Sequence, residues 1–331
     1  MKSKRRAFMI SALFLLVLSI SLLATGCGGS EGGESDVTKI TIVQQYGMAY
    51  APFKVMEEQS LVESNYKGEG TLEVEYSVLN SGSSINDAFL SGDVQVGAMG
   101  VAPAITGTMS DAGYKICSNM SAQPHRIMTN NPKIKTLKDI GAKDQIALVN
   151  LGSFQHILLA MACEQQLGDA HALDNNIAAM AHPDGMTALL NKQVACQLTT
   201  SPYVFKEAAE GMTEVKALSE VWPEGNSFIV AVASKDLHDN DPEAYQAVVD
   251  AIAEAIEYLN NNKEEAAELL CANEDVDAET MLEWLNDPAC VYDTQLKGVM
   301  DMADFMAENK FLEVEGPSDI SDLVFDNVQG E

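Results

Sequence analysis

Positive charge is scarce in this 331-residue chain, which holds 20 Lys and Arg residues against 49 Asp and Glu residues. Four of the basic residues, Lys2, Lys4, Arg5 and Arg6, fall within the first six positions. From residue 27 onward only 16 basic residues remain against the same 49 acidic ones, a net charge of −33. A chain this acidic repels polyanions, which excludes nucleic acid and anionic lipid as partners of its main part.

Cysteine is also sparse, and its spacing does not suit a metal site. The chain has six cysteines, with no C-x-x-C and no neighbouring pair of histidines, so we expect no zinc site. Most lie in apolar stretches such as "LAMACEQQ" and "QVACQL", which favours buried thiols. The sequence leaves open whether Cys271 and Cys290 form a disulfide.

The motifs of several common enzyme classes are missing. The chain has no G-x-x-x-x-G-K-[ST], no H-E-x-x-H and no nucleophile elbow. Asp87 and Asp111 are isolated acids without a paired partner for acid–base work. We therefore expect a non-enzymatic protein without catalytic residues, metal or cofactor.

The first 26 residues have the organisation of a secretory signal. The basic start is followed by an apolar run over 7–24 and then by A-T-G-C. The alternative is an uncleaved anchor, because the run approaches the roughly 18–20 residues that span a bilayer. Small residues directly before Cys27 resemble the lipobox of bacterial lipoproteins, although Ala24 stands where a lipobox usually has leucine. The resemblance implies a lipid on Cys27 and a chain held at the extracytoplasmic face of the cell membrane.

The segment after the signal is polar and rich in glycine. It reads "GGSEGGESD" and has too little apolar surface to join a core, so we expect a flexible tether over 27–37. The remaining chain is long enough for two lobes.

Strand and helix patterns alternate from residue 38 onward. "KITIVQQ" and "TLEVEYSVLN" alternate like strands, and Ser83 or Ser84 is expected to cap the helix that begins near "SSINDAF". "DVQVGAM" is a further strand, followed by Pro103 in a first helical turn. This order predicts an α/β fold with mostly parallel sheets.

Two passages repeat about one hundred residues apart. Residues 88–96 and 188–196 each read as the end of an apolar helix, a polar turn and a short strand, and each precedes a small-residue loop with a proline. Residues 40–53 and 146–159 likewise each run from a strand through a glycine-bearing loop into a helix. The repetition in the same order predicts two lobes with similar connectivity.

In open α/β sheets, ligands bind beyond the carboxyl ends of the strands. Loops at those ends contain glycines, which allow close backbone approach, and helix N-termini, which favour anions. The aromatic residues of these loops could offer flat apolar contacts. The expected ligand-binding residues are Tyr46, Gly47, Ser83, Ser84, Gly100, Val101, His125, Ser153, Phe154, Ser201, Tyr203 and Trp222.

The other histidines divide by their surroundings. His156 falls one turn inside a predicted helix, where packing or a ligand role are both open. His171, His182 and His238 neighbour Asp or Pro in polar turns, and we expect them at the surface.

The tail from residue 236 reads as a series of helices. "DNDPEAYQAVVDAIAEAIEYLNNN" combines an Asp cap, a proline in the first turn and apolar residues at helical spacing. We expect a C-terminal helical extension that packs on the first lobe.

Several segments together resemble a known family. "FLSGDVQVGAMGVAPAI", "KTLKDIGAKDQIALVNLGSFQHILLAMACEQQLG", "GMTALLNKQVACQLTTSPYVFKEAAEGM" and "DPEAYQAVVDAIAEAIEYLN" occur in an order that resembles solute-binding proteins of ABC importers for nitrate, sulfonate, taurine and thiamine precursors. The resemblance implies a two-lobed, type II periplasmic-binding-protein-like fold that closes on its ligand by hinge motion. The implied division is 38–124 with 226–331 for one lobe and 125–225 for the other, with chain crossings near 121–129 and 218–227.

The resemblance implies a lipoprotein that delivers a small molecule to an ABC permease and its ATPase. The expected loops offer serines and aromatic rings but no lysine or arginine apart from Arg126, which favours a sulfonate-like organic anion or a heteroaromatic compound over bare nitrate. The alternatives are an enzyme of the same fold acting on a pyrimidine or thiamine precursor, and an extracellular sensing module.

Overall fold

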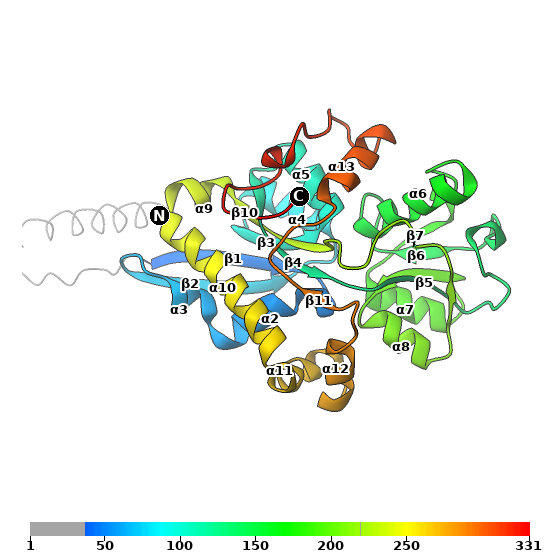
Figure 1. The fold of residues 1–331 in the computed structure, drawn as a ribbon, viewed down its shortest axis with the longest axis horizontal. Helices are drawn as coiled ribbons and strands as arrows, with labels where there is room; N and C mark the ends of the chain where they lie inside the picture. The colour runs from blue at the N-terminus through cyan, green and yellow to red at the C-terminus, as the bar shows by residue number, and fades with distance from the viewer. Residues whose placement is uncertain (1–36, 219) are drawn as a thin grey trace, which may run out of the picture. The chain divides into compact units, whose positions relative to one another are not determined.

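The computed structural model describes residues 37–218 and 220–331 (Figure 1). The expected signal over 1–26, its cysteine Cys27 and almost all of the expected tether lie outside the described residues. No helix in the described ranges is long and apolar enough to cross a membrane.

Two β-sheets organise the described chain. The first has the order β11-β4-β10-β3-β1-β2 and the second β7-β6-β8-β5-β9. We call the first sheet with its helices lobe I and the second sheet with its helices lobe II. The strands of lobe I are β1 (Val37–Gln44), β2 (Thr71–Val78), β3 (Val96–Gly100), β4 (Tyr114–Ala122), β10 (Ile229–Ser234) and β11 (Val291–Tyr292). Those of lobe II are β5 (His125–Thr129), β6 (Ile146–Leu148), β7 (Ile177–Ala179), β8 (Cys196–Thr200) and β9 (Thr213–Val215).

The chain passes between the sheets twice. The first crossing is residues 123–124, between β4 and β5, and the second is 216–228, between β9 and β10. The residue boundaries expected for the two lobes remain a prediction.

The predicted α/β fold class is confirmed, and the sheets are mixed in detail. β1 pairs in parallel with β2 and β3, and β6 with β7 and β8. β10 and β5, the strands that enter each lobe from a crossing, run antiparallel to their neighbours. Each of these strands enters from the other lobe and not through a crossover helix from a strand of the same sheet, so the rule that makes βαβ units parallel does not apply to it.

The predicted repeat corresponds to one strand–loop–helix unit in each lobe. In lobe I, α4 (Gly82–Ser91) leads into β3 and then α5 (Val101–Met109). In lobe II, α7 (His182–Leu190) leads into β8 and then α8 (Tyr203–Ala209). The other helices of these lobes are α2 (Ala51–Gln59), α3 (Leu61–Asn65) and α6 (Phe154–Leu167).

The C-terminal helical extension is present. Its helices are α9 (Lys235–Asn240), α10 (Pro242–Asn261), α11 (Lys263–Leu270), α12 (Ala278–Leu285) and α13 (Val299–Glu308). α10 begins where the sequence predicts, because the Asp241 side chain accepts a hydrogen bond from the Ala244 N–H and Pro242 occupies the first turn. α10 packs on α2, α3 and β4 in lobe I.

The extension also contacts lobe II, which the sequence did not indicate. α13 packs against α5 in lobe I and against α6 in lobe II. After α11, Glu274 forms an ion pair with Lys206 of α8 at 2.9 Å, and Trp284 of α12 stacks on Phe205 with ring centroids 5.6 Å apart. The extension therefore bridges the lobes on two sides.

The described cysteines are all free thiols, including Cys271 and Cys290. Four of them are buried and Cys271 is half-buried. Within the described ranges there is no cluster of His, Cys, Asp and Glu that could hold a metal ion.

Candidate functional site: a cleft between the two lobes

A cavity lies where the two lobes face each other. Its walls come from segments that follow β1, β2 and β3 and from the residue that precedes β10 in lobe I, and from loops and helix starts in lobe II. The lining residues are Gln45, Tyr46, Tyr50, Asn80, Gly82, Gly100, Pro103, Val149, Ser153, Phe154, Gln155, Ala181, His182, Thr200 and Phe228.

Four helices begin at this cavity. The first residues of α4 and α6, Gly82 and Phe154, line it, as do the N-cap residues of α5 and α7, Gly100 and Ala181. The first N–H groups of a helix lack partners within it, and the helix dipole places partial positive charge there. These helix starts therefore favour an anionic or electron-rich group although the described residues of the lining include no cation.

The cavity lining contains no formal charge. Among the described residues that line it, none is Lys, Arg, Asp or Glu. Arg126, the one basic residue near the expected site, forms an ion pair with Glu214 at 3.5 Å and does not line the cavity. Helix termini and neutral donors must then carry any anion recognition here.

Two lining side chains have buried polar atoms without a partner among the described residues. These atoms are the amide Nε2 of Gln155 and the hydroxyl Oγ1 of Thr200. A buried polar group without a hydrogen bond costs about 1–3 kcal/mol, so a ligand that bonded to these two atoms would recover that free energy. Both can donate a hydrogen bond.

Aromatic rings form the inner wall. Phe154 of α6 packs against Phe228 with ring centroids 4.8 Å apart and against Trp222 at 5.6 Å. His125 lies behind them, 4.3 Å from Phe228 and 5.0 Å from Phe154. Phe154 and Phe228 face the cavity, whereas His125 and Trp222 line a separate cavity near the second crossing.

The free space in the cleft is small. The cavity volume is about 20 Å³, which is room for about one water molecule. Gly100 explains part of this, since a Cβ atom there would lie 2.8 Å from the Phe154 Cβ. At Gly47 a Cβ atom would lie 3.0 Å from the backbone oxygen of Ser201. These two glycines thus permit close approach of the opposite lobe, whereas the sequence predicts that they permit approach of a ligand.

Four of the expected ligand-binding residues line the cavity: Tyr46, Gly100, Ser153 and Phe154. Ser153 is the N-cap of α6, and its hydroxyl accepts the His156 N–H at 3.2 Å. Tyr46 is exposed at the mouth.

Three expected residues of lobe I contact other groups. Ser83 accepts a hydrogen bond from the Asn150 side chain of lobe II at 2.9 Å, close to the cavity. Ser84 pairs with Ser81 at 2.9 Å, and Val101 donates its N–H to the Phe228 carbonyl. The cap of α4 is Ser81, so the expected cap at Ser83 or Ser84 is wrong, because the helix already begins at Gly82.

The remaining expected residues lie behind the cavity wall. Ser201 is fully buried and donates to Gln123 Oε1 at the first crossing. Tyr203 stacks on His182 with ring centroids 5.5 Å apart. Neither side chain lines the cavity.

His182 is buried at the cavity, so the expectation from the sequence that it lies at the surface is wrong. It is 8% exposed, begins α7 and lines the cavity. Its Nδ1 lies 3.4 Å from Thr199 Oγ1, and burial lowers the pKa of the ring to about 4. Burial also lowers the pKa of His125 to about 3. Both rings are therefore neutral at pH 7 and can donate or accept without adding charge.

Several further residues that the sequence did not predict line the cavity. Gln45, Asn80, Gln155 and Thr200 carry the polar side chains among them. Gln155 and Thr200 could have been predicted from the sequence, because they directly adjoin expected residues in helix-start and strand-end positions.

Comparison with known proteins agrees with this architecture. A family model described as the NMT1-like family matches residues 33–272. The chain belongs to the NMT1-like family. None of the curated proteins compared matches it.

Solved structures similar to this NMT1-like family member are distant in sequence. The alkanesulfonate-binding protein SsuA from Xanthomonas axonopodis pv. citri, bound to MOPS, has 14% identity and a TM-score of 0.70, covering 88% of this chain and 98% of that one. The Candida albicans CA3427 gene product, described as having the generic periplasmic binding protein fold, has 15% identity and a TM-score of 0.67, with 88% and 98% covered. The periplasmic nitrate-binding protein NrtA from Synechocystis PCC 6803 has 15% identity and a TM-score of 0.61, with 78% and 74% covered. The family and fold expected from the sequence are confirmed.

Proposed function

We propose that this protein is an extracytoplasmic solute-binding lipoprotein that captures a small organic anion, sulfonate-like, or a heteroaromatic compound and delivers it to an ABC permease. The family and the two-lobed fold support a binding role, and the similar solved structures above include proteins described as binding alkanesulfonate and nitrate.

The observation that carries the proposal is a cavity with four helix N-termini and no charged side chain. Helix termini can stabilise an anion by about 0.3–1 kcal/mol each at exposed sites and more where they are partly buried. Unpartnered Gln155 and Thr200 supply directed donors, and Phe154 and Phe228 supply an apolar wall. This combination favours a ligand with a compact anionic or electron-rich head and an apolar body.

The small free space implies that ligand entry requires the lobes to separate. A sulfonate is larger than the one water molecule for which the cleft has room. Hinge motion at the crossings 123–124 and 216–228 is the structural route for such opening.

A thermal-shift screen tests the ligand class. Purified protein is melted with alkanesulfonates, nitrate, pyrimidines and aromatic carboxylates, since a ligand that binds the folded state raises its stability by about 2.7 kcal/mol at 100 times Kd. We expect stabilisation by an organic sulfonate or a heteroaromatic compound and none by nitrate. Stabilisation by nitrate alone, or by none of the classes, contradicts the proposal.

The lipid anchor on Cys27 is tested separately. We expect Cys27→Ala to release the protein from the membrane fraction into the soluble fraction, whereas Cys271→Ala serves as a control and leaves it bound. Membrane retention of Cys27→Ala would instead indicate an uncleaved anchor.

The enzyme and sensing alternatives make different predictions. Turnover of a bound ligand by purified protein would favour an enzyme of the same fold. Ligand-dependent association with a receptor instead of a permease would favour a sensing module.

A further inference from the structure

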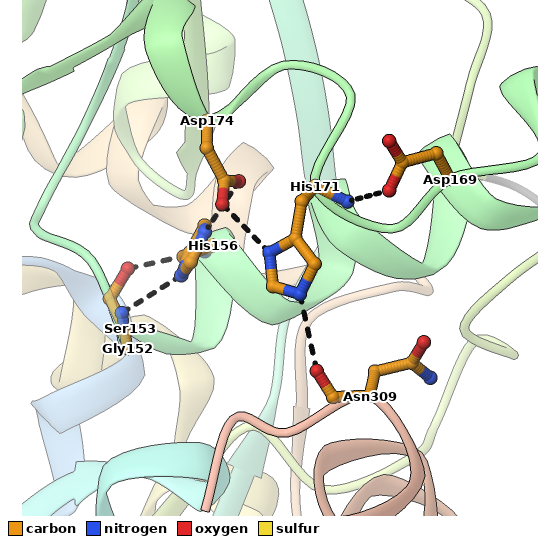
Figure 2. A network of polar contacts seen from close by, with 7 residues as sticks. All are labelled: Gly152, Ser153, His156, Asp169, His171, Asp174 and Asn309. Atoms are coloured by element: carbon orange, nitrogen blue, oxygen red, sulfur yellow. Dashed lines mark hydrogen bonds and ion pairs between the residues drawn. The ribbon is translucent and has the colours of Figure 1, made fainter.

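A second polar cluster lies outside the cleft and joins lobe II to the C-terminal extension. It comprises His156 of α6, His171 in the turn after α6, Asp174 at the start of the short 3-10 helix η3 (Asp174–Asn176), and the backbone carbonyl of Asn309 after α13 (Figure 2). We call these four groups the histidine latch.

His171 is held between two acceptors. Its Nδ1 lies 2.8 Å from Asp174 Oδ2, and its Nε2 lies 3.2 Å from the Asn309 carbonyl oxygen. A carboxylate and a carbonyl offer no proton, so both ring nitrogens must carry one for both hydrogen bonds to form. The geometry therefore fits the imidazolium form of His171.

His156 connects the latch to the start of α6. Its Nδ1 accepts the Gly152 N–H at 2.9 Å, which leaves the ring proton on Nε2. That nitrogen lies 3.2 Å from Asp174 Oδ1 and donates to it. Asp174 thus binds both histidines, and the contacts run from Asn309 to Gly152, next to the cavity-lining Ser153.

The latch spans the two lobes. α13 packs against α5 of lobe I and α6 of lobe II. Phe311, two residues after Asn309, contacts both latch rings, with centroids 4.7 Å from His171 and 5.3 Å from His156. Separation of α6 from the α13 segment would break the His171–Asn309 hydrogen bond and both Phe311 contacts, while the hydrogen bonds of Asp174 to the two histidines lie within lobe II and would remain.

We infer that the histidine latch is a proton-dependent fastening between lobe II and the C-terminal extension, which favours the closed arrangement when His171 is protonated. Its effect on solute affinity rests on the proposed function, whereas its effect on closure does not. Protonation linked to closure means that the closed state binds the proton more tightly than the open state.

The charges around His171 support this direction. Asp174 and the Asn309 carbonyl raise its pKa, and Asp169, which accepts the His171 backbone N–H at 2.9 Å, adds a smaller effect of the same sign. The neighbouring His156 has its pKa lowered by burial, and its Nδ1 accepts the Gly152 N–H, which requires an unprotonated Nδ1. Among the described residues, Glu308 and Lys310 flank Asn309 and form no ion pair with the latch.

These contacts determine in which direction pH changes the closure of the lobes. At a pH below the ordinary pKa of a free histidine, both states are protonated and the latch is fully formed. As the pH rises through the raised pKa of His171, the ring loses a proton and one of its two hydrogen bonds. Closure therefore weakens as the pH increases.

Single-molecule FRET on the full-length protein in detergent, without ligand, tests the latch. Dyes are placed at Leu90→Cys in lobe I and Lys143→Cys in lobe II, both at exposed positions, in a Cys271→Ser background. We expect the closed-to-open ratio to fall at least threefold between pH 5.5 and pH 8.5. His171→Ala removes this dependence.

The matched control is His238→Ala. His238 also neighbours an aspartate, Asp239 at 2.7 Å, and stacks on Phe325, but its contacts stay within lobe I and the extension. It should retain the full pH dependence. A ratio that does not change with pH, or changes equally in His171→Ala, overturns the latch.

A second measurement does not depend on the labelled variants. We expect ¹⁵N NMR of the histidine rings to show His171 with both nitrogens protonated at pH 6.5, and a mainly neutral His171 would overturn the latch. If the latch fails while a solute still binds, the proposed function stands. If the latch holds while no candidate solute binds, the proposed function fails alone.

Discussion

The Asn150 side chain donates a hydrogen bond to Ser83 Oγ across the two lobes, with 2.9 Å between the atoms. Asn150 lies in the loop between β6 and α6, and Ser83 lies in the first turn of α4. The two residues are 67 positions apart in the sequence. Their contact shows that the starts of α4 and α6 face the same gap.

Loss of this contact should favour the open arrangement. Asn150→Ala removes this interlobe hydrogen bond, worth about 0.5–1.5 kcal/mol, together with a local one to the Leu151 carbonyl within lobe II. We expect the affinity for a bound solute to fall by about two- to tenfold, measured by isothermal titration calorimetry. Asn240→Ala, which removes a bond to Asp236 within α9, should leave the affinity unchanged. Equal affinities for Asn150→Ala and the unmodified protein would mean that the contact does not bias closure.

The Thr200 hydroxyl should lower the stability of the ligand-free protein and contribute to ligand binding. Thr200→Val replaces a buried, unpartnered hydroxyl in the cavity with a methyl group of similar shape. We expect the apo melting temperature to stay the same or rise, because an unsatisfied buried group costs about 1–3 kcal/mol. Ligand-induced stabilisation should drop sharply in the same thermal-shift measurement.

Thr108 provides the matched control. Its hydroxyl is also buried without a partner among the described residues, but it lies near the end of α5 and does not line the cavity. Thr108→Val should affect apo stability in the same direction and leave binding intact. Loss of binding in both variants would show that the effect does not come from the cavity.

Glu207 should make the fold less stable as the pH rises. Its side chain in α8 is fully buried, with both oxygens unpartnered among the described residues, and burial raises its pKa to about 8. The folded state keeps this proton between the ordinary pKa and pH 8, while the unfolded state loses it. Stability contributed by the neutral group is therefore full below about pH 4.5 and declines towards pH 8.

Glu207→Gln removes this dependence. We expect the free energy of unfolding of Glu207→Gln to be about 3 kcal/mol higher than that of the unmodified protein at pH 7, given about 1.4 kcal/mol per pH unit. At pH 4.5 the two free energies should be nearly equal. Urea unfolding at both pH values measures the difference. Glu210→Gln, an exposed change just after the same helix, leaves Glu207 in place and should keep the pH dependence of the unmodified protein. A constant difference between Glu207→Gln and the unmodified protein would rule out titration of Glu207.

The cysteines should differ in reactivity. Burial raises the pKa of Cys117, Cys163 and Cys290 to about 12, and that of Cys196 to about 11. Reaction with a thiol reagent requires an accessible thiolate. We expect one fast-reacting thiol among the five described cysteines, Cys271, and Cys271→Ser should abolish the fast phase of labelling. A second fast thiol would contradict the burial of the others.

The location of the cleft could be predicted from the sequence, but its lining only in part. The loops around Tyr46, Gly100 and Ser153 were expected there because strand ends of α/β sheets meet at one edge. Ser201 was expected too, yet its hydroxyl points to Gln123, 78 residues earlier in the chain. A residue's position along a strand does not determine which distant partner its side chain meets.

The sequence by itself determined what local rules control: the alternation of strand and helix, the repeated unit in each lobe, and the start of α10 at Asp241 and Pro242. These features depend on periodicity and on hydrogen bonds between near neighbours. Only the tertiary structure decided that His182 is buried at the cleft and that Asn309 approaches His171 across 138 residues. Such contacts depend on how whole lobes pack, because burial and long-range hydrogen bonds are properties of the assembled fold and not of any short segment.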